Sequence, residues 1–344
     1  MTNKPILIVL GEPYSIFSET LFKLYKSKIY KKLKKPIILI GSKKLLIEQM
    51  LKLKFKFKIN EIKFKDVGKY PIDKKNINII NVNFSYKKVF DKISSKSKNY
   101  IKKCFDIALI LLKKNYAYAL INGPISKKYF LNKKYLGITE YLTKKTNTKN
   151  TAMLIYNSSF SVCPITTHLP ISKVSKNITS KKIIKNILLI NDFFIKKLNK
   201  KPKIAVLGLN PHCETINKFS EEDKIIKPAL KYLLKKNIDA KGLYSADSFF
   251  LKKHINKFDV AMGMYHDQVL APMKTLYNFD AINITLGLPI IRTSVDHGTA
   301  FNIAGKGYAS PESLKLAIRS AAQLAKPLQT AQYEKTTPRT KLSN

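Results

Sequence analysis

The sequence predicts an α/β protein with mostly parallel strands, and three observations support this fold class. Short apolar runs rich in β-branched residues alternate with amphipathic segments along the 344 residues. Hydrophobic residues make up 45% of the chain, which is enough for a substantial core. No internal repeat or heptad pattern points to another architecture. The length suits one large domain or two ordinary ones.

The first third supplies four of the predicted strands. Apolar runs at 5–10, 36–41 and 76–82 have the composition of buried strands, and Lys-rich amphipathic segments lie between them. Apolar residues at helical spacing predict a helix over 98–114 with one buried face. The run 118–124 then reads as a strand that ends in a Gly-Pro break.

The rest of the chain continues the alternation. Strands are predicted at 151–156, 160–168, 203–209, 259–265 and 281–287, and helices at 180–198 and 221–236. A further helix is expected over 310–325, with Ser310 as N-cap and Pro311 in its first position. Residues 326–344 are polar and aperiodic, so we expect a disordered tail there.

Composition argues against several classes of protein. The chain has 61 Lys but only 3 Arg, and its net charge is +42. Nucleic-acid sites favour Arg, whereas this charge is almost all Lys, is spread along the chain and is accompanied by abundant Ile and Asn. We read it as compositional drift and expect no specific nucleic-acid binding.

Location and redox chemistry follow from what the sequence lacks. No apolar run reaches the roughly 18 residues of a membrane helix, so we expect no membrane association. The apolar run near the N-terminus is too short for a signal peptide, which favours a cytoplasmic protein. Cys104, Cys163 and Cys213 are too scattered for a disulfide framework or a CxxC metal site.

Because Lys fills most tolerant positions, stretches without it mark places where a long cation is excluded. Three stand out: 150–172, 204–217 and 258–305, the last interrupted only by Lys274. Burial explains part of this pattern but not the polar residues inside these stretches. Those residues are His168, Asn210, His212, Glu214, His266, Asp267, Asn283, Arg292, Asp296 and His297.

His168, His212 and His266 each follow an apolar strand. In parallel sheets, ligands bind beyond the carboxyl ends of strands, so the three imidazoles could meet at one point. Three neutral imidazoles make a metal site if one coordination position stays open. No local spacing motif ties them together, and from spacing alone they are equally compatible with ordinary polar residues at strand ends.

Two cations in the third stretch suggest an anionic ligand. Arg292 is retained where Lys is absent, which favours a bidentate partner such as phosphate or carboxylate, although a structural salt bridge would also explain it. Lys274 favours a point-charge contact, with an ordinary surface Lys as the alternative. Asn283 is expected within a strand, where Asn is disfavoured, so it either contacts a ligand or pairs with backbone.

No GxGxxG or GxxxxGK[ST] occurs in the chain, so any nucleotide is bound without those loops. The block "YHDQ…APMK…INITLGLPIIRTSVDHGTAFNIAGKG" resembles the signature of the 4-hydroxythreonine-4-phosphate dehydrogenase family of pyridoxal phosphate biosynthesis. "NGPISK", "GITEYL", "TTHLPI", "GLNPH" and "ADSFF" also resemble family motifs and occur in the same order. The resemblance covers about residues 5 to 325.

The resemblance implies a two-lobed α/β/α fold like that of isocitrate and isopropylmalate dehydrogenases. We expect one lobe from 1–130 plus 300–325 and a central lobe from 131–299 that carries the metal ligands and the dimer contacts. The family also implies a homodimer with an active site shared between subunits.

Site roles follow from the same resemblance. One divalent ion (Zn, Mg, Co or Mn) would be held by His168, His212 and His266, with one of these supplied by the partner chain. Contacts to a small phosphorylated amino-acid substrate are implied for Thr139, Lys274, Asn283 and Arg292. NAD contacts are expected from Leu286, Gly287, Asp296 and His297. Catalytic roles are expected for Asp247, Asp267 and Lys274.

The expected activity is NAD-dependent oxidation and decarboxylation of 4-phosphohydroxy-L-threonine to 3-amino-2-oxopropyl phosphate. The chain departs from the family at Ile138, where His is usual, and at Ser15 and Phe17, where Gly is usual. Ile138 cannot donate a hydrogen bond, so a related dehydrogenase of another phosphorylated hydroxy acid, such as 4-phosphothreonate, is the alternative. A non-catalytic, basic nucleic-acid-binding protein is the more remote one.

Overall fold

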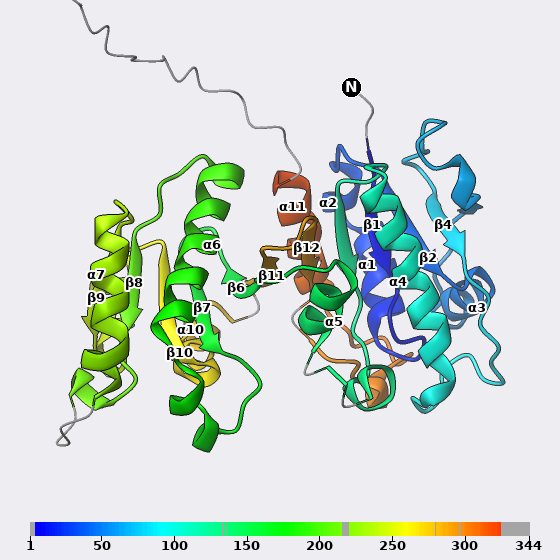
Figure 1. Ribbon diagram of the computed structural model, residues 1–344. Coiled ribbons are helices and arrows are strands. Elements are labelled where there is room, and N and C mark those ends of the chain that lie inside the picture. Colours follow the sequence, from blue (N-terminus) through cyan, green and yellow to red (C-terminus); the bar gives the residue numbers. More distant parts are fainter. Residues whose placement is uncertain are drawn as a thin grey trace, which may run out of the picture.

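The computed structural model describes residues 4–132, 134–135, 137–214, 220–278, 280–295 and 297–324, and these form an α/β protein with helices on both faces of one large sheet (Figure 1). The predicted fold class is confirmed. Figure 1 shows two groups of helices and strands joined through the middle of the sheet.

The sheet has 12 strands in the described residues, in the order β3-β4-β2-β1-β5-β12-β11-β6-β7-β10-β8-β9. The strands are β1 Ile6–Val9, β2 Ile37–Gly41, β3 Ile59–Glu61, β4 Ile77–Asn81, β5 Ala119–Asn122, β6 Ala152–Tyr156, β7 Ser161–Thr166, β8 Ile204–Leu207, β9 Ala240–Tyr244, β10 Val260–Tyr265, β11 Ile282–Leu286 and β12 Ile291–Ser294.

Strand direction reverses in the middle of this sheet. The six strands from β3 to β12 are parallel, and so are the four from β7 to β9. β11 pairs antiparallel with both β12 and β6, and β6 pairs antiparallel with β7. The carboxyl ends of the two parallel blocks therefore point to opposite edges of the sheet.

The helices lie on both faces. They are α1 Phe17–Lys26, α2 Lys28–Lys31, α3 Lys43–Lys52, α4 Lys98–Lys113, α5 Ile138–Lys145, α6 Ser180–Leu198, α7 Lys227–Lys235, α8 Ala246–Phe249, α9 Lys252–Ile255, α10 His266–Tyr277 and α11 Glu312–Leu324. Most predicted strands and helices are found within a few residues of their expected bounds.

Alternate residues of the strands enter different cores, as the pleat requires. On one face a continuous core runs from α1 and α3 through α11 to α6 and α7. On the other face there are two separate cores, one under α4 and α5 and one under α8, α9 and α10. This second face is therefore not covered by a single apolar layer in its middle.

The elements that were not predicted from the sequence are β3, β9, β12, α5, α8, α9 and α10. The division into lobes at 131 and 300 stays a prediction. Two contacts cross those boundaries: β12 pairs with β5, and Tyr141 and Leu142 of α5 belong to the core under α4. The predicted tail 326–344 lies outside the described residues. Within the part of the chain that the structure describes, every helix is too short or too polar to span a membrane.

Candidate active site

The gap between the two cores of the second face is a cavity of about 580 Å³. Its floor is a group of polar residues on the central strands. Asn283 of β11 lies opposite both Ile155 of β6 and Ser294 of β12, so all three side chains share one face. Arg292 is two residues before Ser294 and points to the same face. Polar side chains thus replace the apolar layer at the centre of the sheet.

One wall of the cavity comes from β5 and the segments that follow it. Asn122 ends β5, and the loop behind it packs directly on the loop after β1. Gly11 has φ +74°, and a Cβ there would lie 2.5 Å from the Pro124 carbonyl oxygen, so only glycine allows this approach. Lys127 begins a π-helical turn, and Ile138, Thr139 and Glu140 begin α5.

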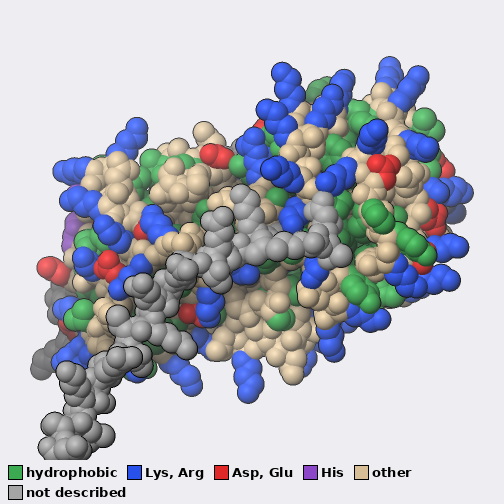
Figure 2. All heavy atoms as spheres, turned by 90° about the horizontal axis from the view of Figure 1, so that it is seen from above, with side chains coloured by type: hydrophobic (Ala, Val, Ile, Leu, Met, Phe, Trp, Pro, Cys, Tyr) green, Lys and Arg blue, Asp and Glu red, His purple; other side chains and the backbone are tan. Residues whose placement is uncertain are grey.

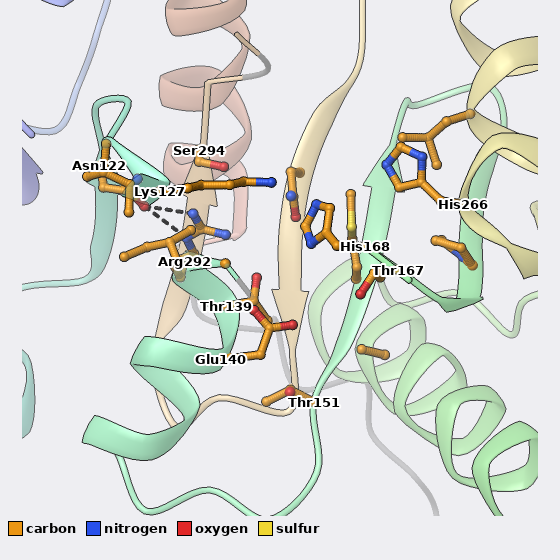
Figure 3. Close-up of a pocket in the computed structure, with 18 of the residues that line it drawn as sticks. Asn122, Lys127, Thr139, Glu140, Thr151, Thr167, His168, His266, Arg292 and Ser294 are labelled. Carbon is orange, nitrogen blue, oxygen red and sulfur yellow. Dashed lines mark hydrogen bonds between the residues drawn. The ribbon is translucent and has the colours of Figure 1, made fainter. Parts of the chain in front are cut away.

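The opposite wall carries two imidazoles. His168 follows β7 and His266 is the first residue of α10, and β7 and β10 are adjacent parallel strands. The two rings have centroids 5.8 Å apart. Figure 3 shows both on the side of the pocket opposite Arg292.

The junction between β10 and α10 is held tightly, which fixes His266. Gln268 accepts a hydrogen bond from the Met264 N–H at 2.6 Å and donates to the Gly208 carbonyl at 2.7 Å. A Cβ on Gly263 would overlap Val269, so glycine lets the helix fold back onto its strand. The motif "GMYHDQ" is thus a strand-to-helix turn that places an imidazole at the cavity wall.

The cavity is rich in cations. Arg292, Lys127, Lys182 and Lys274 line it, and Glu140 is the single acid among its described lining residues. Burial lowers the pKa of Arg292 to about 10, while the charge of Glu140 opposes that shift. Burial also lowers the pKa values of Lys182 and Lys274. An anionic ligand would relieve the cost of holding these charges partly out of water.

Three buried acceptors facing the cavity lack a hydrogen-bond partner among the described residues. They are Asn283 Oδ1, Glu140 Oε2 and His297 Nε2. His297 holds its Nδ1 3.0 Å from the Gly298 carbonyl, so Nδ1 carries the proton and Nε2 is the acceptor. Unpaired buried acceptors are costly, so a ligand with N–H or O–H donors would suit this cavity.

The surroundings of His168 favour its neutral form, which can act as a base or as a metal ligand. Its pKa is lowered first by partial desolvation and then by the charge of Lys127, with a smaller effect from His266. His266 Nδ1 lies 2.6 Å from Asp267 Oδ1, which leaves Nε2 for another partner. Neutral imidazole nitrogens are the form that binds divalent metals.

The predicted site residues divide into two groups. His168, His266, Thr139, Lys274, Asn283, Arg292 and His297 all line the cavity. His212 does not: its side chain is 75% exposed, and Nδ1 lies 3.7 Å from Asp247 Oδ2. His212 is five residues beyond β8, in a turn where its own φ is +55°.

The remaining predicted residues lie elsewhere. Asp267 contacts His266 but is 83% exposed, and Asp247 bonds to Ser245 near His212. Leu286 and Gly287 line a second cavity of about 280 Å³, and Arg292 lines both cavities. Asp296 falls outside the described residues.

Sequence reasoning missed several lining residues, among them Asn122, Lys127, Glu140, Lys182 and Ser294. A signal existed for part of this set. Asn283 with Thr285, and Arg292 with Ser294, are polar pairs two residues apart within β-branched runs, which places each pair on one face of a strand.

Comparison with known proteins identifies relatives of this fold and sequence. The 4-hydroxythreonine-4-phosphate dehydrogenase of Sulfurihydrogenibium sp. (strain YO3AOP1) is 38% identical over 324 residues, 93% of this chain and 98% of the relative. The D-threonate 4-phosphate dehydrogenase of Pectobacterium atrosepticum is 36% identical over 227 residues, 65% of this chain and 69% of the relative.

A solved structure agrees with these sequence matches. The crystal structure of 4-hydroxythreonine-4-phosphate dehydrogenase from Klebsiella pneumoniae superimposes with a TM-score of 0.81 at 28% identity, covering 94% of this chain and all of the other. The family described as "Pyridoxal phosphate biosynthetic protein PdxA" matches residues 32–321. Sequence, fold and cavity agree, and the chain belongs to this PdxA family.

Proposed function

We propose that this chain catalyses the NAD-dependent oxidation and decarboxylation of 4-phosphohydroxy-L-threonine to 3-amino-2-oxopropyl phosphate, as a cytoplasmic homodimer. The family and the relatives' names support this assignment of the substrate. The observation that carries it is Arg292, a fully buried guanidinium that faces a cavity and has no carboxylate partner within 4 Å among the described residues.

The chemistry of the substrate matches that of the cavity. A phosphate and a carboxylate require cations, which Arg292, Lys127 and Lys182 supply. An ammonium and a hydroxyl are donors, and they would satisfy the unpaired acceptors Asn283 Oδ1 and Glu140 Oε2. A ligand with anionic groups only would leave those acceptors unpaired.

The residues present fit a divalent metal in part. His168 and His266 supply two imidazoles whose ring centroids are 5.8 Å apart. In the described residues of one chain there is no group of three His, Cys, Asp or Glu side chains arranged to hold an ion. We propose that the exposed His212 of a second copy supplies the third imidazole. When bound, the ion would polarise the substrate hydroxyl as a Lewis acid.

The dinucleotide residues also fit in part. His297 Nε2 is a buried, unpaired acceptor in the cavity, and a nicotinamide carboxamide N–H would satisfy it. Leu286 and Gly287 face the second cavity, so in one chain the residues expected to contact NAD do not converge. NAD supplies the hydride acceptor that oxidation of an alcohol requires.

Lys274 is the side chain best suited to move the proton. It lines the cavity, and burial lowers its pKa, which favours the neutral amine that a general base requires. It would accept the hydroxyl proton as the hydride leaves the same carbon. The resulting β-keto acid loses CO₂ when its C–C bond breaks, and the Lys274 ammonium returns the proton to the carbon of the enolate. Asp267 acts by orienting His266.

An assay of NADH formation with added divalent metal tests this proposal. We expect turnover with 4-phosphohydroxy-L-threonine, metal in the purified protein, and loss of both in His168→Ala. His254→Ala is the control, because His254 bonds to the Ser248 carbonyl away from the cavity. No NADH with any phosphorylated hydroxy acid would contradict the proposal.

4-Phospho-D-threonate is the second candidate substrate, and Ile138 is the observation that favours it. Ile138 lines the cavity and offers no hydrogen bond, and one relative is named for that substrate. The ratio of kcat/KM for the two substrates decides between them. A large gain for 4-phosphohydroxy-L-threonine in Ile138→His would show that a missing contact limits the first activity.

A further inference from the structure

Among the residues that the structure describes, Arg292 donates hydrogen bonds to neutral acceptors only. Its Nε and Nη2 donate to Asn122 Oδ1 at 3.0 and 2.8 Å, and its Nη1 donates to Thr285 Oγ1 at 2.9 Å. Asn122 and Thr285 are themselves 3% exposed, so water does not substitute for them. Asn122 also donates to the Gly123 carbonyl, which fixes the orientation of its amide.

The donors of Arg292 can be counted. A guanidinium has five N–H groups, and these bonds use three of them. With respect to the described residues, one N–H on Nη1 and one on Nη2 are left. Arg292 lines the cavity, and Figure 3 shows its side chain between Lys127 and Thr139. Two N–H groups of one guanidinium are the arrangement that binds two oxygens of a phosphate or carboxylate.

The same bonds allow Thr285 to donate its proton to a neighbouring hydroxyl. Arg can only donate, so Thr285 Oγ1 must accept from Nη1, and its own proton is free to go elsewhere. Thr139 Oγ1 lies 3.4 Å away. If Thr285 donates to it, the proton of Thr139 is left to point at a ligand. Thr139 lines the cavity beside Arg292, so in that arrangement its hydroxyl is a third donor.

We infer that Asn122 and Thr285 are positioning residues. They orient Arg292 and Thr139 so that these two side chains form a receptor that presents only hydrogen-bond donors to a ligand. Such a receptor selects a fully deprotonated oxyanion, because a protonated oxygen would place a hydrogen against a donor. The ligand it suits best is the dianion of a phosphate monoester. The inference rests on the proposed function in that these two residues are taken to contact the substrate.

The charge of Glu140 affects where that anion binds. It is the only acid among the described lining residues, and its unpaired Oε2 is an acceptor. In Figure 3, Glu140 lies on the Thr139 side of Arg292, whereas Lys127 and Ser294 lie on the other. Repulsion by Glu140 and attraction by Lys127 both draw the phosphate towards the Arg292 guanidinium, which lies between Lys127 and Thr139.

Thr285→Val tests the inference, because it removes the hydroxyl and keeps the shape. We expect the dissociation constant of inorganic phosphate, measured by calorimetry, to rise about tenfold, as loss of a hydrogen bond to a charged group does. The KM for the phosphorylated substrate should rise similarly, and kcat should change less than about twofold. Thr285→Ser should restore both constants.

Thr293→Val is the matched control. Thr293 is buried next to Arg292 in the same sheet, and its hydroxyl donates to the Ala317 carbonyl, away from the cavity. Its phosphate affinity should equal that of the unmodified protein. Asn122→Asp keeps an acceptor for Nε and Nη2 but adds a negative charge, so it should weaken phosphate binding more than Thr285→Val does.

Two outcomes separate this inference from the proposed function. If Thr285→Val and Thr293→Val bind phosphate equally well in an active dehydrogenase, the positioning role is wrong and the function stands. If the protein has no dehydrogenase activity but Thr285→Val still loses phosphate affinity, the receptor stands and the proposed reaction is wrong. In the active enzyme, KM should fall as pH rises through about 6, where a phosphate monoester becomes a dianion.

Discussion

Glu12 follows β1 and is buried, and neither of its carboxyl oxygens has a hydrogen-bond partner among the described residues. Burial raises its pKa from 4.5 to about 7, although the nearby Ser97 side chain and Ser126 backbone oppose part of that shift. The folded protein therefore holds this proton more tightly than the unfolded chain does. It follows that the contribution of Glu12 to the free energy of unfolding is largest below pH 4.5 and falls as pH rises towards 7.

We predict that Glu12→Gln removes this pH dependence. Between pH 4 and pH 8 the free energy of unfolding of the unmodified protein should fall by up to about 3 kcal/mol more than that of the variant. Urea denaturation at several pH values measures the difference. Glu61→Gln is the control, because Glu61 is in an exposed ion pair with Lys43. Parallel pH profiles for Glu12→Gln and the unmodified protein would rule the prediction out.

At the residue scale, site residues could be predicted from the sequence in stretches that lack lysine. They could not be predicted in stretches where lysine is common. Asn283, Arg292 and Lys274 stand out because the stretch around them excludes Lys. Lys127 and Lys182 line the same cavity, but they lie in Lys-rich segments, where a cavity lysine and a surface lysine look alike. Only the folded chain distinguishes them, because burial depends on what packs beside each one.

At the scale of elements, α1 holds the segment that follows His297. Glu19 accepts hydrogen bonds from the Gly307 and Ala309 N–H groups at 3.1 and 2.6 Å. Lys23 pairs with Glu19 at 2.9 Å and donates to the carbonyls of the same two residues. The Glu19 side chain is fully buried, so these bonds are shielded from water.

We predict that Glu19→Gln lowers the free energy of unfolding by about 2 kcal/mol, because a buried charge-assisted bond is lost. The KM for NAD should also rise, since His297 precedes the released segment. Thermal unfolding and steady-state kinetics measure the two effects. Glu312→Gln breaks an exposed pair with Lys315 and should cost less than about 1 kcal/mol. Equal costs for the two variants would contradict the prediction.

Elements with a strong hydrophobic pattern were predicted, and those without one were not. β12 has only four residues and includes a buried Arg, and β9 is half exposed. α10 follows β10 with no intervening loop and contains Pro272, which usually marks the end of a helix. The start of α10 depends on Gln268, which bonds to Gly208 just after β8, and on Gly263, which leaves room for Val269. The local sequence does not show these contacts.

At the scale of the whole molecule, we predict that two inactive variants complement each other. A shared site would use His168 and His266 of one chain and His212 of the other. A heterodimer of His168→Ala with His212→Ala would then contain one intact site, because a twofold dimer has two equivalent sites. The purified heterodimer should show about half of the normal activity, and an unpurified random mixture about a quarter, because only half of its dimers are heterodimers.

Co-expression with two affinity tags and an NADH assay of the purified heterodimer provide the measurement. His254→Ala mixed with the unmodified chain should show full activity. If His212→Ala alone keeps normal metal content and turnover, the third ligand is not His212 and the shared site is wrong.

The net charge of the whole molecule affects how strongly it attracts an anionic ligand. On the face shown in Figure 2, Lys and Arg side chains are spread over both halves and do not form one stripe. A net charge of +42 surrounds a cavity that itself holds four cations. Long-range attraction of a phosphorylated ligand is therefore expected at low ionic strength, and salt should weaken it.

The antiparallel strands β6 and β11 limit how the enzyme can close on its substrate. They carry the hydrogen bonds that join the two parallel blocks, and the cavity floor is built on them. The halves are thus not hinged on a free linker. A motion that brought the two walls together would twist this shared backbone. It would therefore also shift Asn283 and Arg292 and change their distance to a bound ligand.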